Sequence, residues 1–201
     1  MPVREVATML MTHEREKLIN TIIYFAQNTQ KCGKIKLFKL LYFLDFEHFK
    51  DTGRNVTGQD YYAWKMGPVP QRLFDEINCP EPDMAKAIDF TEIPTGYGRP
   101  MLTFKPKAEF DGSHFSKRER KLMERLAKEF EHHKAEDMIE ATHLENQPWD
   151  KVFNQWGGQQ EKIPYDLAVR AQERDEVMAV ANEHQQLMGS LRGDARVSVL
   201  R

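Results

Sequence analysis

The sequence predicts a mainly α-helical (α+β) fold, in which a compact helical domain with a small antiparallel β-sheet is followed by a C-terminal helical extension. Three observations support this prediction. Residues 35–50, IKLFKLLYFLDFEHFK, form an apolar stretch of helical length. Two short segments, 61–66 and 101–105, have the length and composition of strands. Beyond Gly157-Gly158 the chain becomes long, polar and poor in apolar residues.

Helices are expected where apolar residues recur at helical spacing or follow a helix-starting residue. The stretch 35–50 is apolar on nearly every side, apart from a narrow polar stripe, so we expect it to be the central core helix. Ser116 and Glu119 have the spacing of a capping box. The expected helices are 12–29, 35–50, 70–77, 117–130, 135–144, 148–153 and 165–191.

Two strands are expected to form one small antiparallel sheet. The first is the aromatic segment 61–66, which the turn Gly67-Pro68-Val69-Pro70 ends. The second is 101–105, which Pro106 stops and which is expected to pair with the first. Residues 78–100 are rich in proline and glycine and are expected to be mostly loop.

The glycine pair at 157–158 divides the chain into an expected domain, 1–158, and an expected helical extension, 159–201. The helix of the extension has a thin apolar seam, formed by Leu167, Val177, Val180 and Leu187. Such a seam suits a contact between helices of two chains. The extension is therefore expected to be a separable appendage or an assembly element, for example of a homodimer.

Charge and cysteine usage limit the kinds of partner. Lysine and arginine number 29 against 31 acidic residues, so the chain lacks the basic excess of a phosphate-binding protein. No helix-turn-helix pattern is evident, and DNA binding is not expected. Cys32 and Cys79 form no CxxC pair and are expected to be free thiols. With neither a signal-peptide core nor an apolar run of about 20 residues, a cytoplasmic protein without a membrane segment is expected.

Motifs of common enzyme classes are missing from the sequence. It has no GxGxxG or GxxxxGK[ST] loop, no HExxH pair and no GxSxG elbow. One charged cluster has ligand spacings that suit the metal of a hydrolase, and its members are His132, His133, Glu136, Asp137, Glu140 and His143. The other interpretation is a solvated helix face, which predicts no catalytic residue, no metal and no cofactor.

Two segments combine aromatic residues with rigid proline turns. In one, His143 and Glu145 precede Pro148-Trp149, which makes a corner between two helices. In the other, Trp64 precedes the Gly-Pro-Val-Pro turn. Each segment has two interpretations that the residues leave open. It either closes the core, or it presents aromatic anchors or a free sheet edge to a partner.

Three motifs in order carry a resemblance to a known family. KLFKLLYFLD begins at residue 36, GQDYYAWKMGPV begins at residue 58, and HLENQPW begins at residue 143. Over roughly residues 15–155 the chain resembles the SocA-like antitoxin, or Panacea-domain, family, which includes phage-associated GepA-type proteins. The family pattern is carried by Lys36, Leu37, Lys39, Leu40, Leu41, Tyr42, Phe43, Asp45, Gly58, Tyr61, Ala63, Gly67, Pro68, Val69, His143, Pro148 and Trp149.

The resemblance implies an antitoxin that neutralises a cognate toxin, encoded by an adjacent gene, through direct protein–protein contact and without catalysis. Escort of the toxin to an energy-dependent protease is a variant of this role. The alternatives are a phage- or prophage-associated regulatory or interaction protein and a metal-dependent hydrolase. The surface expected to bind the toxin joins the two proline-containing segments and comprises Trp64, Lys65, Gly67, Pro68, Arg72, His143, Glu145, Pro148 and Trp149.

Overall fold

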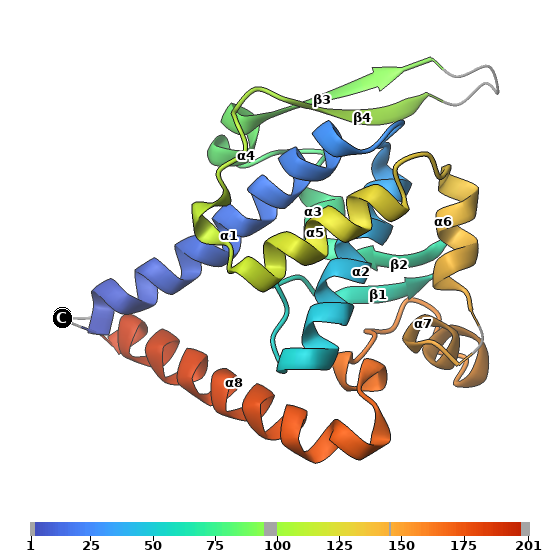
Figure 1. Cartoon of the computed structure of the whole chain (residues 1–201). Helices are drawn as coiled ribbons and strands as arrows, with labels where there is room; N and C mark the ends of the chain where they lie inside the picture. The colour runs from blue at the N-terminus through green and yellow to red at the C-terminus, as the bar shows by residue number, and fades with distance from the viewer. Residues whose placement is uncertain (1–2, 95–99, 145, 198–201) are drawn as a thin grey trace.

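The computed structural model describes the backbone of residues 3–94, 100–144 and 146–197, and the side chains of 13–94, 100–144 and 146–190 (Figure 1). It confirms a mainly helical fold with small antiparallel β-structure. The helices are α1 Val3–Asn28, α2 Lys34–Thr52, α3 Gln71–Glu76, α4 Pro82–Ala87, α5 Lys117–Glu129, α6 Ala135–Thr142, α7 Pro148–Asp150 and α8 Arg174–Val197. The strands are β1 Tyr61–Trp64, β2 Gly67–Pro70, β3 Ile88–Ile93 and β4 Met101–Pro106. Short helical turns are η1 Gly112–His114, η2 Lys151–Gln155, η3 Tyr165–Ala168 and η4 Ala171–Glu173.

Helix α2 is the centre of the fold, as its apolar sequence predicts. It contacts α1, α5, α6, β2, β4 and the turn η3, so nearly every other layer packs on it (Figure 1). Leu37, Leu40, Leu41 and Leu44 have no exposed surface. Burying one such leucine stabilises the fold by roughly 1.5–3 kcal/mol, and α2 therefore provides much of the hydrophobic stabilisation.

Polar side chains of α2 are buried as well, among them Lys36, Lys39 and Asp45, and groups of other segments satisfy them. The Lys36 ammonium donates to the carbonyls of Gln30, Glu131 and His133 at 2.9–3.0 Å. This side chain joins the turn between α1 and α2 to the turn between α5 and α6. Lys36 is therefore a structural clamp at one end of the central helix.

Asp45, nearer the other end of α2, also binds a segment outside the helix. Its carboxylate accepts hydrogen bonds from the amides of Val56 and Thr57 at 2.7 and 2.8 Å, from the Thr57 hydroxyl, and from the Tyr61 hydroxyl at 2.7 Å. Burial raises the pKa of Asp45, and these hydrogen bonds oppose the rise. The loop between α2 and β1 is therefore fastened to the core helix.

The first expected strand is a hairpin rather than a single strand. Residues 61–64 form β1, and the Gly-Pro-Val-Pro segment, expected as a turn, is itself β2. Both of its prolines occupy strand positions, with Pro68 opposite Ala63 and Pro70 opposite Tyr61. A two-stranded ladder tolerates proline because the missing N–H can lie on its outer side.

A later segment pairs with the other side of β1. The amide of Ala63 donates to the Glu161 carbonyl at 2.8 Å, and the Gln160 amide returns a bond to the Ala63 carbonyl at 2.7 Å. The Ile163 amide donates to the Tyr61 carbonyl at 2.8 Å. The free sheet edge considered for partner binding is therefore already occupied along β1 by the chain itself.

The second expected strand, 101–105, pairs with β3 and not with the first strand, so this sequence prediction was wrong. β3 and β4 form a separate antiparallel hairpin, with Ile88 opposite Pro106 and Ile93 opposite Met101. Residues 78–100, expected as mostly loop, contain both α4 and β3. In Figure 1 this hairpin lies across the top of the molecule beside α1, which β4 contacts.

Two helix starts show the value and the limit of local signals. The capping box before α5 is confirmed, because the Ser116 hydroxyl accepts from the Glu119 amide and the Glu119 carboxylate accepts from the Ser116 amide. The first helix begins at Val3 rather than at Thr12. Nothing in the preceding residues breaks helical geometry, so a good capping residue at position 12 did not act as a cap.

The segment after Gly158 is attached to the domain by two different contacts. Ile163 is fully buried in the core, and the Tyr165 ring stacks on Phe46 and Phe49 at 4.3 and 5.0 Å between centroids. The helix expected over 165–191 begins at Arg174, after two short turns. The domain boundary at residue 158 remains a prediction. These contacts attach the chain to the core as far as η3, so the less tightly attached part of the extension begins after η3.

Helix α8 packs on α1 and on the C-terminal end of α2 (Figure 1). Of its expected seam, Val177 is buried, whereas Val180 and Leu187 are 36% and 53% exposed. At Gly53, which ends α2 with φ +68°, a Cβ atom would lie 2.6 Å from the Val177 carbonyl oxygen. The missing side chain therefore allows α8 to approach.

Cys32 is buried and Cys79 exposed, and both are free thiols as expected. Burial raises the pKa of Cys32 to about 11, so this thiol stays protonated. Within the ranges that the structure describes, no helix combines the length and apolar character needed to cross a membrane.

Candidate functional site

The two segments that the sequence singles out meet in space. We call their contact the hairpin–corner junction, formed by Trp64, Gly67 and Pro68 of the β1–β2 hairpin and by Thr142, His143 and Trp149 of the corner between α6 and α7. The Trp149 indole Nε1 donates to the Trp64 carbonyl at 2.9 Å. Trp149 is only 2% exposed. Its burial favours the structural interpretation for this side chain itself.

Aromatic stacking fixes the corner side of the junction. The His143 ring lies parallel to the Trp149 indole, with 3.6 Å between centroids and 5° between planes. Phe153 stacks on Trp149 at 4.7 Å. Since Pro148 starts the short helix α7 with a fixed φ, the position of Trp149 is set both by its backbone and by its neighbours.

Lys39 of α2 binds the hairpin side of the junction. Its ammonium donates to the Pro68 carbonyl at 2.8 Å, and burial lowers the pKa of Lys39 to about 7. At Gly67, where φ is +92°, an added Cβ would lie 2.8 Å from Lys39 Nζ and 2.8 Å from Thr142 Oγ1. Only glycine fits between the central helix and the corner at this point.

Electrostatics at the junction follow from this buried ammonium. The pKa of His143 is lowered, first by burial and second by the positive charge of Lys39, while Asp150 opposes the shift. Among the described side chains, Trp64 Nε1 and His143 Nε2 are buried nitrogen atoms without a hydrogen-bond partner. A buried nitrogen that lacks a partner costs about 1–3 kcal/mol.

The described residues among those expected to bind the partner differ in exposure. Gly67, Pro68, Pro148 and Trp149 are buried, Trp64 and His143 are half-buried, and Lys65 and Arg72 are exposed. Glu145 lies outside the described residues. The buried members hold the junction together, and direct contact with a partner is left to their exposed neighbours.

Two exposed hydrophobic residues beside the junction were not among the residues expected to bind the toxin. Met66 at the hairpin turn is 52% exposed, and Leu144, next to His143, is 60% exposed. Met66 immediately precedes Gly67, and a Cβ atom at Gly67 would touch Thr142, which lies two residues before Leu144. The junction therefore holds together the two segments that carry Met66 and Leu144. The available signal was an apolar residue inside a tight turn, where a polar residue is usual.

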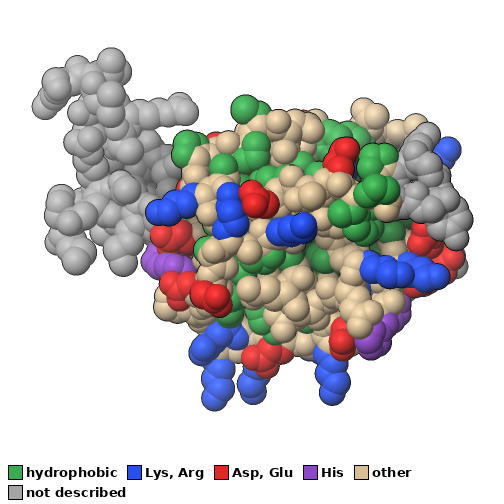
Figure 2. Space-filling view, turned by 90° about the horizontal axis from the view of Figure 1, so that it is seen from above, with side chains coloured by type: hydrophobic (Ala, Val, Ile, Leu, Met, Phe, Trp, Pro, Cys, Tyr) green, Lys and Arg blue, Asp and Glu red, His purple; other side chains and the backbone are tan. Residues whose placement is uncertain are grey.

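A second apolar surface lies beside the β3–β4 hairpin. Figure 2 looks onto this side of the molecule and shows hydrophobic side chains exposed among charged ones. A groove of about 710 Å³ is lined there by residues that include Ile35, Ile93, Met101 and Leu102. Residues 95–99, which lie between β3 and β4 in the sequence, are outside the described residues.

The metal cluster considered from the sequence is not assembled. Asp137 accepts a hydrogen bond from the Lys134 amide at 2.7 Å and so caps α6, while His132 and His133 are exposed before this helix. Within the described chain, two other groups bring three ligand atoms within 4.8 Å of one another, and neither includes His132, His133, Asp137 or Glu140. The groups are His13, Glu16 and His114, and Glu76, Glu81 and Asp83.

An arginine already occupies the acidic group. Arg15 donates to Asp83 through Nε and Nη2 at 2.8 and 2.7 Å, and to Glu76 through Nη1 at 2.7 Å. These bonds lower the pKa of Asp83. The acidic group is therefore an ion-pair network that joins α1 to α3 and α4, and the carboxylates are not available to a metal ion.

Comparison with known proteins gives one match. The family described as antitoxin SocA-like, Panacea domain, matches residues 37–150, from the second residue of the Lys-Leu motif to the corner. No curated protein and no solved structure matches the chain. The matched residues cover more than half of the chain and include both sides of the hairpin–corner junction. The family is not a known enzyme family. The chain belongs to the SocA-like antitoxin family with a Panacea domain.

Proposed function

We propose that this protein is the antitoxin of a toxin–antitoxin pair and that it neutralises its toxin by direct binding, without catalysis. The toxin is encoded by an adjacent gene. The observation that supports this proposal most is the placement of exposed Met66 and Leu144 beside a rigid, buried junction. Large apolar side chains that stand free on a fixed backbone are typical of a protein-binding surface.

The junction explains why these residues suit binding. The bond from Trp149 to Trp64, the bond from Lys39 to Pro68, and the stacked rings at the corner fix the backbone on both sides. Little conformational entropy is then lost when a partner covers the surface. The exposed cations Lys65 and Arg72 flank it and favour an acidic partner by raising the association rate.

The test begins with the neighbouring reading frames. Each is expressed alone and together with this chain, and a frame that stops growth alone but not with the chain is the toxin. Affinity for that toxin is then measured by calorimetry for wild type and for Met66→Asp with Leu144→Asp. We expect at least tenfold weaker binding and lost rescue of growth, while the urea unfolding midpoint stays unchanged.

Leu187→Asp is the matched control, because Leu187 is equally exposed, at 53%, on α8. It should bind and rescue like wild type. If the control loses binding and the junction variant keeps it, the partner surface lies on α8 and the assignment to the junction is wrong. If no neighbouring frame is toxic, the protein is instead a phage- or prophage-associated regulatory or interaction protein.

Charge reversal tests the contribution of the cations. In Lys65→Glu with Arg72→Glu and Glu145→Lys, the association rate should fall and should no longer decrease with added salt, because charges that attracted the partner now repel it. Escort to a protease is the finer form of the proposal. It predicts that the bound toxin is degraded faster than free toxin by an energy-dependent protease, and equal rates would leave occlusion as the mechanism.

A further inference from the structure

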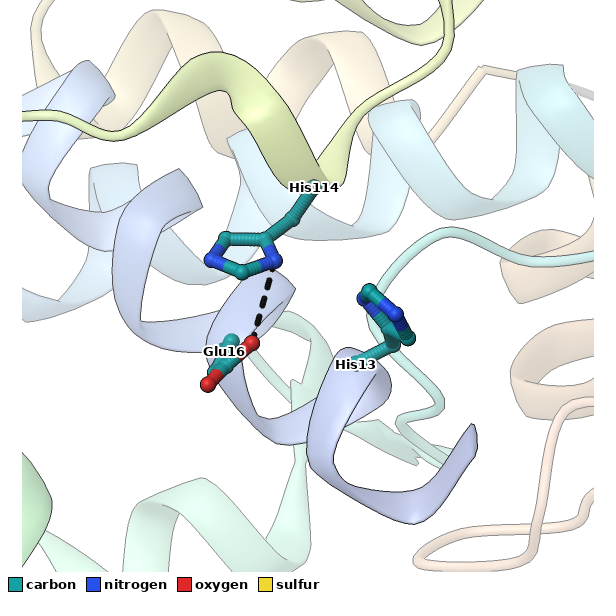
Figure 3. Close-up of side chains that lie close together, drawn as sticks. All are labelled: His13, Glu16 and His114. Carbon is teal, nitrogen blue, oxygen red and sulfur yellow. Dashed lines mark ion pairs between the residues drawn. The ribbon is translucent and has the colours of Figure 1, made fainter. Parts of the chain in front are cut away.

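Three potential metal ligands from distant parts of the sequence meet on one side of the molecule. His13 and Glu16 lie three residues apart on α1 and therefore share a helix face. His114 ends the short turn η1, which precedes α5. One ligand atom from each lies within 4.8 Å of the others, and His114 Nδ1 is 3.0 Å from a Glu16 carboxylate oxygen (Figure 3).

A second carboxylate lies on the other side of the His114 ring. Asp111 Oδ2 is 3.3 Å from His114 Nε2. The Asp111 backbone is itself held, since its amide donates to the Asn20 side-chain oxygen of α1 at 2.8 Å. With Nε2 beside Asp111, Nδ1 is the ring nitrogen left to bind a metal ion, and a carboxylate in this position is how proteins orient metal-binding histidines.

The Glu16 side of the ring then lacks a positive charge. When Nε2 carries the ring proton, Nδ1 and the Glu16 carboxylate oxygen, 3.0 Å apart, are two acceptors that face each other. Among the described residues, Glu16 forms an ion pair with neither lysine nor arginine, and neighbouring Lys17 is bound to Glu119 at 2.7 Å. A cation between the two acceptors would satisfy both.

We propose that His13, Glu16 and His114 bind one divalent transition-metal ion, with zinc as the best fit, and that Asp111 orients His114. Two imidazoles and one carboxylate form a donor set for zinc and its neighbours, rather than for magnesium or calcium. Ligand atoms around tetrahedral zinc are about 3.3 Å apart. The Glu16–His114 pair is already near this spacing, and the His13 ligand atom, within 4.8 Å of the others, needs to approach by at most about 1.5 Å.

The surroundings leave room for a fourth ligand. His13 and His114 line a cleft of about 680 Å³, whose other walls include His48, Arg54, Arg118 and His184. The cleft is open to solvent and can supply water as the fourth ligand of a three-residue zinc site. The bound ion would join the β4–α5 connection to α1, and it would thus stabilise the fold independently of toxin binding.

The test uses the full-length protein, stripped of metal, and zinc chloride alone. Calorimetry should show one equivalent of zinc bound, and the melting temperature should rise with zinc concentration. His114→Ala, His13→Ala and Glu16→Gln should each weaken zinc binding at least tenfold, and Asp111→Asn should weaken it about 10- to 100-fold. Cobalt(II) bound in place of zinc should give the intense visible absorption band of a tetrahedral site. His13→Ala should remove this band.

The matched control is the double variant His132→Ala with His133→Ala, which removes two exposed histidines from another surface. It should bind zinc like wild type. The proposal is overturned if wild type binds less than one equivalent, or if the control weakens binding as much as the site variants do. In that case His114 contacts Glu16 and Asp111 without a metal ion. Circular dichroism of each variant without metal separates loss of the site from loss of the fold.

Discussion

Replacing Lys39 with methionine should stabilise the protein at neutral and acidic pH, although the change removes a hydrogen bond. The Lys39 side chain is almost completely buried, and its ammonium donates to the Pro68 carbonyl at 2.8 Å. No carboxylate forms an ion pair with it among the described residues. Burial therefore disfavours the charged form, and the pKa of Lys39 falls from 10.5 to about 7.

The magnitude follows from this shift. Each unit by which the pKa is lowered corresponds to about 1.36 kcal/mol, so the buried charge destabilises the fold by on the order of 4–5 kcal/mol below pH 7. Removing the ammonium leaves the Pro68 carbonyl without its donor, which costs about 1–3 kcal/mol. Lys39→Met should therefore gain roughly 1–4 kcal/mol at pH 6.

The gain should depend on pH with a definite sign. Below pH 7 the folded and unfolded states both carry the proton, and the gain is constant. Between pH 7 and 10.5 the unfolded state binds more protons than the folded state, so wild-type stability rises with pH. At pH 9 the advantage of Lys39→Met should have fallen by about 2–3 kcal/mol and so be close to zero.

Urea unfolding followed by circular dichroism at pH 6, 7, 8 and 9 measures this difference directly. Lys121→Met, at an exposed position on α5, supplies the baseline for loss of a lysine from the surface. A difference in free energy of unfolding between wild type and Lys39→Met that stays constant from pH 6 to 9 would refute the reasoning. It would show that Lys39 does not lose its proton on folding.

Two further predictions concern the core and the boundary of the domain. Leu41→Asp should prevent folding, since Leu41 has no exposed surface and an unpaired buried charge costs several kcal/mol. A soluble variant with the wild-type melting temperature would show that α2 is not the core helix. A chain ending at residue 170 should remain folded, whereas one ending at residue 158 loses Ile163 and Tyr165 from the core and roughly 3–6 kcal/mol of stability. Equal unfolding midpoints for the two shortened chains would place the boundary at 158 after all.

The sequence predicted the central elements because their signals are local. An almost continuous apolar stretch identified α2 as the core helix, and the Ser116–Glu119 spacing located the start of α5. Strand β4 was expected, but its partner β3 was missed since the prolines around it outweighed the alternation of IDFTEI at residues 88–93. The polar stripe of α2 was visible, but its burial was not, because its partners are main-chain groups from distant loops.

The candidate site shows the same division. The order of the motifs identified the hairpin and the corner, and the contact from Trp149 to the Trp64 carbonyl joins positions 85 residues apart. No local pattern encodes such a contact. The exposure of Met66 and Leu144 also depends on what the folded chain leaves uncovered. His13 and Glu16 have a helical spacing, but their third member, His114, is supplied only by the tertiary fold.

The pairing of residues 160–163 with β1 also affects how molecules of this protein behave toward one another. Without this segment, the amide of Ala63 and the carbonyls of Tyr61 and Ala63 would lose their partners. Unpaired groups along a strand readily recruit a strand from another molecule. The short stretch that buries Ile163 therefore also covers an edge through which molecules could aggregate. A chain cut before residue 160 should aggregate increasingly as its concentration rises.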